Sequence, residues 1–597
     1  MLILSIFVLF LFTISAVTLS MPAVISLTKN LGIIDMPDFC QTTQENKSSR
    51  KVHSEPIPRS GGLSVVLVVL TIMMLHTLPR ELDIIYFSSL LIFLLGFLDD
   101  CNSLSAKLRL LFQLVVTVVA LYSSDLVVDT LFLTPELKIY LGSYWGFVFS
   151  SFVVIGAINA TNLIDGLDGL AGGIVFCSIL TLSYINIVQT NNLSLVYHIS
   201  IPILGSLIGF LRFNMHPAKI FLGDGGSTWL GFMVGILMVM CLINFSPSEP
   251  IVFSKSINMD LNLFQPPKNP IPFISVIMCL ALPILDTSTV IMRRLLNKKN
   301  PLKPDKNHLH HQLLRIGLSH QKSVALLYFL AFFIGLIGIF PIVFASYKLW
   351  ALPWVVTAIL PYGLYRISVL NPNNLSPHPE KAKTPKYRVT VRKNKNFILR
   401  NWETINKYII FSVIGVAHVF ASTPSLELGY AELMVLSFVL INQFYVKRTD
   451  FFQTLLTTLA TAFLLMIINY NQVIIEIFST KYRLHSYYNY YCYLLFFSSL
   501  GLLFFSFKRR HLEITPTCFL LLTIPFIVTM LPLPWSETSR LQTISLWTFI
   551  LFFSLRALCQ MKKILYKKLM NLIILALVPV VLTSLYRMKI IYPDTLP

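Results

Sequence analysis

The sequence predicts an all-α fold, a polytopic helical membrane protein, and three observations support this prediction. Hydrophobic residues make up 55% of the 597 residues, the mean hydropathy is +0.72, and only 12% of residues are charged. That charged fraction is about half of what is usual in soluble domains. Apolar runs of about 20 residues recur along the chain, each long enough to cross a bilayer as a helix. Basic residues gather between these runs, as the positive-inside rule expects.

We expect about 11 spans in the first part of the chain and about seven more in a C-terminal extension. The first set is predicted near residues 3–26, 62–78, 83–98, 108–123, 144–160, 169–189, 195–212, 221–244, 271–292, 323–345 and 350–368. The second set is predicted near residues 407–423, 429–446, 452–477, 488–507, 514–533, 541–558 and 567–586.

Between the two sets, residues 371–406 are polar, basic and rich in proline and asparagine. This composition predicts a cytoplasmic linker that lies on anionic lipid head groups. The expected organisation is therefore a membrane domain of residues 1–370, the linker of residues 371–406, and an additional membrane domain of residues 407–597 without a recognisable chemical motif.

The first basic residue, Lys29, follows the first apolar run, which predicts a span with its N-terminus outside rather than a cleaved signal peptide. The basic connections then lie in the cytoplasm. Four polar clusters share that side: Asp99-Asp100, Asn162 to Asp168, Lys219 to Ser227, and His308 to His311. We therefore expect the four clusters to form one active site on the cytoplasmic face of the membrane.

Net charge and cysteine content exclude two other classes of protein. The net charge of +20 is accounted for by the basic loops, and no separate basic surface indicates nucleic-acid binding. The eight cysteines are scattered without a CxxC pair, so neither a disulfide framework nor a zinc site is predicted.

Asp99 and Asp100 end an apolar run. The helix dipole disfavours adjacent carboxylates at a C-terminal helix end, so the pair indicates a cation or a function rather than an ordinary polar helix end. Lys107 and Arg109 follow closely and could hold phosphate.

The next two clusters offer ligands for a cation and for phosphate. Asn162, Asp165 and Asp168 are spaced by three, share a face if that turn is helical, and carry oxygens suited to a hard cation. The alternative is a loop with Asx turns. The glycine-rich segment around Asp224 could place backbone N–H groups against phosphate and a carboxylate against Mg²⁺, although Gly-Asp-Gly-Gly is also a common turn.

His308, His310 and His311 follow a run of cations and could grip a diphosphate. A histidine–metal site is a rival interpretation, and an ordinary basic loop that contains histidine is another.

Together, the clusters resemble the polyprenyl-phosphate N-acetylhexosamine-1-phosphate transferases of glycosyltransferase family 4, over residues 1 to about 370. The matching segments are Arg59-Ser60-Gly61-Gly62, Asp99-Asp100, Asn162 to Gly169, Phe221 to Ser227, and His308-Leu309-His310-His311. Leu309 interrupts the run of three histidines that is typical of the peptidoglycan-precursor branch. The resulting His-Leu-His-His pattern favours the undecaprenyl-phosphate N-acetylglucosaminyl-1-phosphate transferase branch. Cys101-Asn102-Ser103 departs from the family, which often has a further charged residue after the aspartate pair.

The resemblance implies a role for each cluster. Asn162 and Asp224 are expected to hold Mg²⁺, with Mn²⁺ as an alternative. Asp165 and Asp168 are expected to line the nucleotide site, and Arg109 and Lys219 to contact substrate. The expected catalytic residues are Asp99 and Asp100, which would face the lipid phosphate, and His308, His310 and His311, which would contact the diphosphate.

The implied reaction transfers N-acetylhexosamine-1-phosphate from a UDP-sugar to undecaprenyl phosphate, releases UMP, and starts an envelope glycan such as O-antigen. The expected location is the bacterial inner membrane, and a homodimer is an open expectation. Three alternatives remain: phospho-MurNAc-pentapeptide transfer, transport of a lipid-linked sugar, and a non-catalytic scaffold.

Overall fold

The computed structural model describes residues 2–36, 56–75, 80–102, 104–134, 137–190, 195–243, 271–298 and 308–343, with residues 352–353, 355–356, 359, 474–477, 480–483 and 516. The chain divides into two compact units. One comprises Leu9–His378 and Thr515–Thr523, and the other comprises Met1–Val8, Pro379–Ile514 and Ile524–Pro597. The helices that carry the four clusters belong to the first unit. The predicted linker of residues 371–406 lies outside the described residues.

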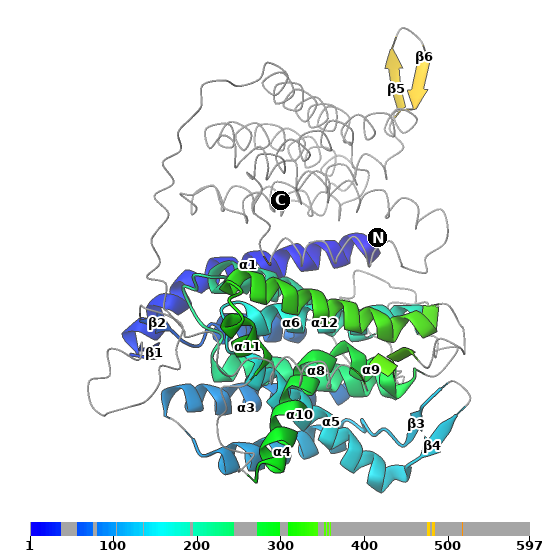
Figure 1. The fold of residues 1–597 in the computed structure, drawn as a ribbon. Coiled ribbons are helices and arrows are strands. Elements are labelled where there is room, and N and C mark those ends of the chain that lie inside the picture. Colours follow the sequence, from blue (N-terminus) through cyan, green and yellow to red (C-terminus); the bar gives the residue numbers. More distant parts are fainter. Residues whose placement is uncertain are drawn as a thin grey trace. The chain divides into compact units, whose positions relative to one another are not determined.

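Helices dominate the described residues, so the predicted all-α class is confirmed (Figure 1). The helices are α1 (Leu2–Asn30), α2 (Gly62–Leu75), α3 (Arg80–Cys101), α4 (Ala106–Ser123), α5 (Gly142–Ile164), α6 (Leu170–Thr190), α7 (Leu195–Asn214), α8 (Gly223–Leu242), α9 (Phe273–Cys279), α10 (Ala281–Leu296), α11 (Leu309–Arg315) and α12 (His320–Val343).

Every span predicted up to residue 345 contains helix, but fewer helices than predicted can cross a membrane by length and composition. Among the described residues, six are long and apolar enough, or seven if α9 and α10 are counted as one bent span. Two shorter apolar helices lie at Gly62–Met74 and Leu170–Asn186. The predicted span near 350–368 and nearly all of the second set fall outside the described residues.

The span predicted at 271–292 is broken. The axes of α9 and α10 differ by 86°. Pro283 stands in the first turn of α10. Pro283 has no backbone N–H to bond the carbonyl of Cys279, four residues earlier, and the helix breaks at Leu280, between α9 and α10.

The described residues also include short antiparallel pairs of strands, which an all-α prediction does not include. They are β1 (Ile34–Asp35) with β2 (Ile57–Pro58), β3 (Thr130–Phe132) with β4 (Lys138–Tyr140), and β5 (Ile474–Ile477) with β6 (Thr480–Arg483). Because Ile474–Ile477 is a strand, the predicted helical span near 452–477 is wrong at its C-terminal end.

α8 runs through the middle of the helical unit, where α3 and α5 are its main neighbours (Figure 1). All of its residues except Asp224 are buried. A Cβ atom added at Gly231 would lie 2.6 Å from the Cα of Ile158, and one at Gly96 would lie 2.6 Å from the Asp224 carbonyl oxygen. Small residues thus let α5 and α3 approach α8 closely, as is common between membrane helices. This approach brings the end of α3 to the beginning of α8.

Candidate active site

The two adjacent aspartates at the end of α3 make different contacts. Asp99 is 9% exposed, and its carboxylate accepts hydrogen bonds from Arg109 Nη1 at 2.5 Å and from the Leu104 N–H at 2.6 Å. Leu104 lies in the turn that joins α3 to α4, and Arg109 lies in the first turn of α4. Asp99 therefore holds Arg109, a predicted substrate ligand, in place next to the end of α3.

Asp100 instead binds the N-terminus of α8. Its two carboxylate oxygens accept hydrogen bonds from the backbone N–H groups of Asp224 (3.0 Å) and Gly225 (3.2 Å). A carboxylate is well suited to this position because the first N–H groups of a helix lack intrahelical partners and carry partial positive charge. Gly223 has φ +81°, and a Cβ atom there would lie 2.5 Å from Asp100 Oδ2. Glycine is therefore needed at the start of α8.

Asn162, at the end of α5, contacts the first turn of α8. Its Nδ2 lies 3.0 Å from Asp224 Oδ1 and 2.9 Å from Ser227 Oγ. The two predicted metal ligands, 62 positions apart in the chain, are thus neighbours.

Asp165 follows α5 directly and belongs to the same acidic group. Burial raises the pKa of its carboxyl group to about 7, with further contributions from the negative charges of Asp224 and Asp100, whereas Arg59 lowers it. A pKa near neutrality means that an uncompensated carboxylate at this position is costly.

The acidic group fits a magnesium ion. Carboxylate and amide oxygens are the ligands that a hard cation prefers, and a divalent charge would offset the repulsion that raises the Asp165 pKa. The side-chain amide of Asn162 needs only to turn about its last bond to present its oxygen beside Asp224 Oδ1. Asn162 and Asp224 are the residues that would hold such an ion.

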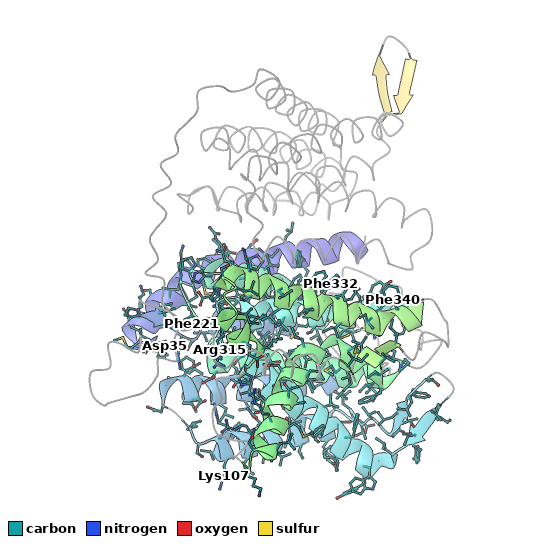
Figure 2. All side chains as sticks on the ribbon, viewed as in Figure 1. Asp35, Lys107, Phe221, Arg315, Phe332 and Phe340 are labelled. Carbon is teal, nitrogen blue, oxygen red and sulfur yellow. The ribbon has the colours of Figure 1, made fainter. Side chains whose placement is uncertain are left out.

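Arg59 brings positive charge to the acidic group. Its Nη2 pairs with Asp35 Oδ1 at 2.8 Å, and its Nη1 lies 4.0 Å from Asp100 Oδ1. The strands β1 and β2, which pair Asp35 with Ile57, hold this arginine close to the beginning of α8. Figure 2 shows Asp35 and Phe221 on the same side of the unit.

Asp168 lies in a second polar group, with two histidines that the sequence interpretation did not include. Its Oδ2 lies 2.8 Å from His216 Nδ1 and accepts a hydrogen bond from the Ala218 N–H, while its backbone N–H donates to His320 Nε2. Burial would raise the Asp168 pKa, but the His216 hydrogen bond and the neighbouring His320 and Ala218 N–H lower it overall.

Ligand atoms of Asp168, His216 and His320 lie within 4.8 Å of one another, close enough to consider a metal site. The two imidazole rings, however, stack at 4.2 Å with planes 20° apart. Nitrogen lone pairs lie in the ring plane, so lone pairs of nearly parallel rings do not converge on one ion. The arrangement fits a hydrogen-bonded group next to the predicted nucleotide site better than a metal site.

The histidine cluster is attached to α10 by Asp286, which accepts hydrogen bonds from His308 Nδ1 and the Leu309 N–H. His310 is 2% exposed, and a Cβ atom at Gly166 would lie 2.2 Å from its Nε2. The pKa of His310 is well below its usual value because the ring is buried and lies near other histidines, first His311 and then His308. His311 lies 4.3 Å from His310 between ring centroids. The cluster therefore meets the turn that contains Asp165.

The two lysines considered in the sequence are placed differently. Lys219 is exposed in the connection between α7 and α8, and its backbone N–H donates to the Phe213 carbonyl. Lys107 projects away from the helices at the start of α4 (Figure 2). Arg109, one helical turn inside the same helix segment, is the cation that reaches Asp99.

Several residues near the site were not predicted as site residues: Asp35, Arg59, His216, Asp286 and His320. One signal could have found Asp286, since it interrupts the apolar run predicted at 271–292 and a charge within such a run indicates function by default. Arg59 stood in a segment that matched the family. Lone histidines in loops, such as His216, carry no signal before the fold is known.

Comparison with known proteins identifies a family for part of the chain. Residues 82–242, which contain the aspartate pair, the Asn162–Asp168 turn and the start of α8, match the family model described as glycosyl transferase family 4.

Individual relatives match over more of the chain. It is 32% identical to a probable undecaprenyl-phosphate N-acetylglucosaminyl 1-phosphate transferase of Bacillus subtilis (strain 168), over 59% of this chain and 88% of that protein. It is 30% identical to a decaprenyl-phosphate N-acetylglucosaminephosphotransferase of Mycolicibacterium smegmatis, over 47% of this chain and 70% of the relative. An undecaprenyl-phosphate alpha-N-acetylglucosaminyl 1-phosphate transferase of Escherichia coli (strain K12) is 26% identical, over 56% and 83%. The chain belongs to glycosyl transferase family 4.

Proposed function

We propose that this protein transfers N-acetylglucosamine-1-phosphate from a UDP-sugar to a polyprenyl phosphate and releases UMP. One observation carries the proposal: Asn162 and Asp224 meet beside Asp165, within reach of the Asp99–Arg109 pair and the histidine cluster. The names of the relatives support both the lipid acceptor and N-acetylglucosamine as the sugar.

The chemistry requires two anions to react. A phosphate monoester has its second pKa near about 6, so the lipid phosphate is mostly a dianion at neutral pH and needs no strong base to attack the β-phosphorus of the UDP-sugar. The residues therefore act mainly by positioning and by electrostatic stabilisation. A magnesium ion held by Asn162 and Asp224 would supply charge neutralisation at the diphosphate.

The contacts of Asp99 favour a positional role over a covalent phospho-aspartyl intermediate. Its carboxylate is engaged by the Arg109 guanidinium and the Leu104 N–H, and a nucleophile would have to leave both partners. We propose that the Asp99–Arg109 pair places the guanidinium against the incoming lipid phosphate, while Asp100 fixes the first turn of α8 and so the Asp224 carboxylate.

We also propose that the site opens on the cytoplasmic face of a bacterial inner membrane. The basic connections predicted to be cytoplasmic adjoin the helix ends that carry the site residues. A transporter of lipid-linked sugars is disfavoured because these residues lie at helix ends, whereas transport sites lie near the bilayer midplane. The homodimer stays a prediction.

The deciding experiment measures UMP release by purified protein with undecaprenyl phosphate, Mg²⁺ and a panel of UDP-sugars that includes UDP-N-acetylglucosamine, UDP-N-acetylgalactosamine and UDP-MurNAc-pentapeptide. We expect release with UDP-N-acetylglucosamine, and its loss in Asp224→Ala but not in Asp125→Ala, which alters an exposed aspartate in the turn after α4. UMP release only with UDP-MurNAc-pentapeptide would show that the protein belongs to the peptidoglycan-precursor branch of the family. No release from folded protein would refute the transferase proposal.

A truncated chain that ends near residue 400 tests the domain proposal. We expect it to retain UMP release, since the site residues lie in residues 1–370 and the family match ends at residue 242. Loss of release from a folded truncated protein would show that the additional membrane domain of residues 407–597 is part of the enzyme.

A further inference from the structure

Asp286, a residue outside the predicted site, links α10 to the histidine cluster. Asp286 is 3% exposed, and its two carboxylate oxygens are both used: Oδ2 lies 2.9 Å from His308 Nδ1, and Oδ1 accepts the Leu309 N–H at 2.8 Å. The family match ends at residue 242, so it does not include this aspartate.

The Asp286 contact selects one form of the His308 ring. An ionised carboxylate only accepts hydrogen bonds, so the hydrogen between the two groups belongs to Nδ1. Nε2 is then the nitrogen left to meet a ligand, and the ring cannot turn over without breaking the 2.9 Å contact. This is how an orienting carboxylate fixes both the tautomer and the direction of an imidazole.

The effect of this orientation extends towards the acidic group. The rings of His308 and His310 are parallel within 7°, with centroids 5.8 Å apart. His310 in turn lies against Gly166, the residue after Asp165. A row of contacts therefore runs from Asp286 through the two imidazoles to the turn that follows α5.

We propose that Asp286 is a positioning residue, which holds His308 with Nε2 directed at the diphosphate of the substrate. This inference rests on the proposed function, because the contact between His308 and the diphosphate is part of it. Asp286 itself touches no substrate and acts through the ring.

The rival interpretation is that Asp286 only stabilises the loop by binding the first N–H of α11. Asp286→Asn separates the two interpretations. The carboxamide has a similar shape, but an NH₂ group replaces one of the two oxygens, so it cannot repeat an arrangement in which Nδ1–H and the Leu309 N–H each donate to a different oxygen. If the amide oxygen of the variant still accepts the hydrogen bond from the Leu309 N–H, its NH₂ group faces His308 Nδ1. Nδ1 must then accept a hydrogen bond, so the hydrogen of a neutral ring moves to Nε2.

The test is a double-mutant cycle in UMP release, with Asp286→Asn, His308→Ala and the double variant. We expect Asp286→Asn to lower kcat by about 10- to 100-fold, with a much smaller change in KM for the UDP-sugar. We expect Asp286→Asn to cause no further loss of kcat when His308 is already replaced by alanine. Asp125→Asn is the matched control at an exposed aspartate and should retain the wild-type rate. Losses that multiply in the double variant would overturn the proposal.

A spectroscopic measurement decides the point even if the protein does not catalyse this reaction. In protein labelled with ¹⁵N in the histidine rings, the signals absent from His308→Ala belong to His308. We expect these signals to show hydrogen on Nδ1 in the wild type and a changed tautomer in Asp286→Asn. An unchanged tautomer would overturn the proposal, whereas an inactive wild type with the expected tautomers would overturn only the proposed function.

Discussion

Replacing Asp165 by asparagine should stabilise the metal-free protein at alkaline pH while abolishing activity. The pKa of this carboxyl group is raised from 3.8 to about 7, mainly by burial and then by the charges of Asp224 and Asp100. The folded state therefore binds this proton more tightly than the unfolded state. The stability gained from protonation is complete below 3.8 and is lost as the pH rises through about 7.

The size of the effect follows from the shift. A rise of about 3 pKa units corresponds to about 4 kcal/mol of unfolding free energy. Asp165 is only half-buried, so solvent screening reduces this figure, and we expect about 2 kcal/mol. That corresponds to a rise in melting temperature of about 3 °C for Asp165→Asn over the wild type.

The assay is thermal unfolding in detergent with EDTA, at about pH 5.5 and about pH 8.5. Because the lower pH, about 5.5, already lies above the ordinary pKa of 3.8, the difference between Asp165→Asn and the wild type should be about half as large at the lower pH as at the higher pH. Added Mg²⁺ should raise the melting temperature of the wild type more than that of the variant, since a bound cation relieves the same repulsion. Asp125→Asn controls for a change in net charge. A difference between variant and wild type that is the same at both pH values would refute this reasoning.

Three further predictions concern the first turn of α8 and its neighbours. Gly223→Ala should destabilise the protein by more than about 2 kcal/mol and reduce UMP release, because its Cβ would meet Asp100 in addition to the strain of its positive φ. Gly317→Ala, at φ +91° with open space around it, should cost only that strain, about 1 kcal/mol, in thermal unfolding. Arg109→Gln should lower kcat by about 100-fold and should also lower the melting temperature, because the buried Asp99 carboxylate loses its charged partner; an unaffected rate would contradict a role at the lipid phosphate. Asn162→Ala should shift the Mg²⁺ concentration for half-maximal UMP release upwards by about 10-fold, and an unshifted Mg²⁺ titration would remove Asn162 from the metal site.

The sequence by itself determined the class of fold and the identity of most candidate residues. Apolar runs of span length leave a chain no choice but helix in a bilayer, because every backbone N–H and C=O must be paired within the segment. For the same reason, the carboxylates and amides at 99–100, 162–168 and 224 stood out, since hydrocarbon does not tolerate them without a purpose.

Only the tertiary structure decided which contacts each of these residues makes. Asp99 and Asp100 are equivalent in a sequence pattern, yet one binds Arg109 and the other binds the start of α8. Their partners lie 10 and 124 positions away in the sequence, and the local periodicity of apolar residues does not predict contacts over such separations.

The structure also added partners that local sequence could not assign. Asp286 reaches His308 across 22 positions because Pro283 and the 86° bend between α9 and α10 change the course of the chain. Glycines at the α3–α8 contact allow the close approach on which the Asp100 hydrogen bonds depend. Local sequence sets helix formation and polarity, whereas the meeting of distant side chains depends on how the helices pack.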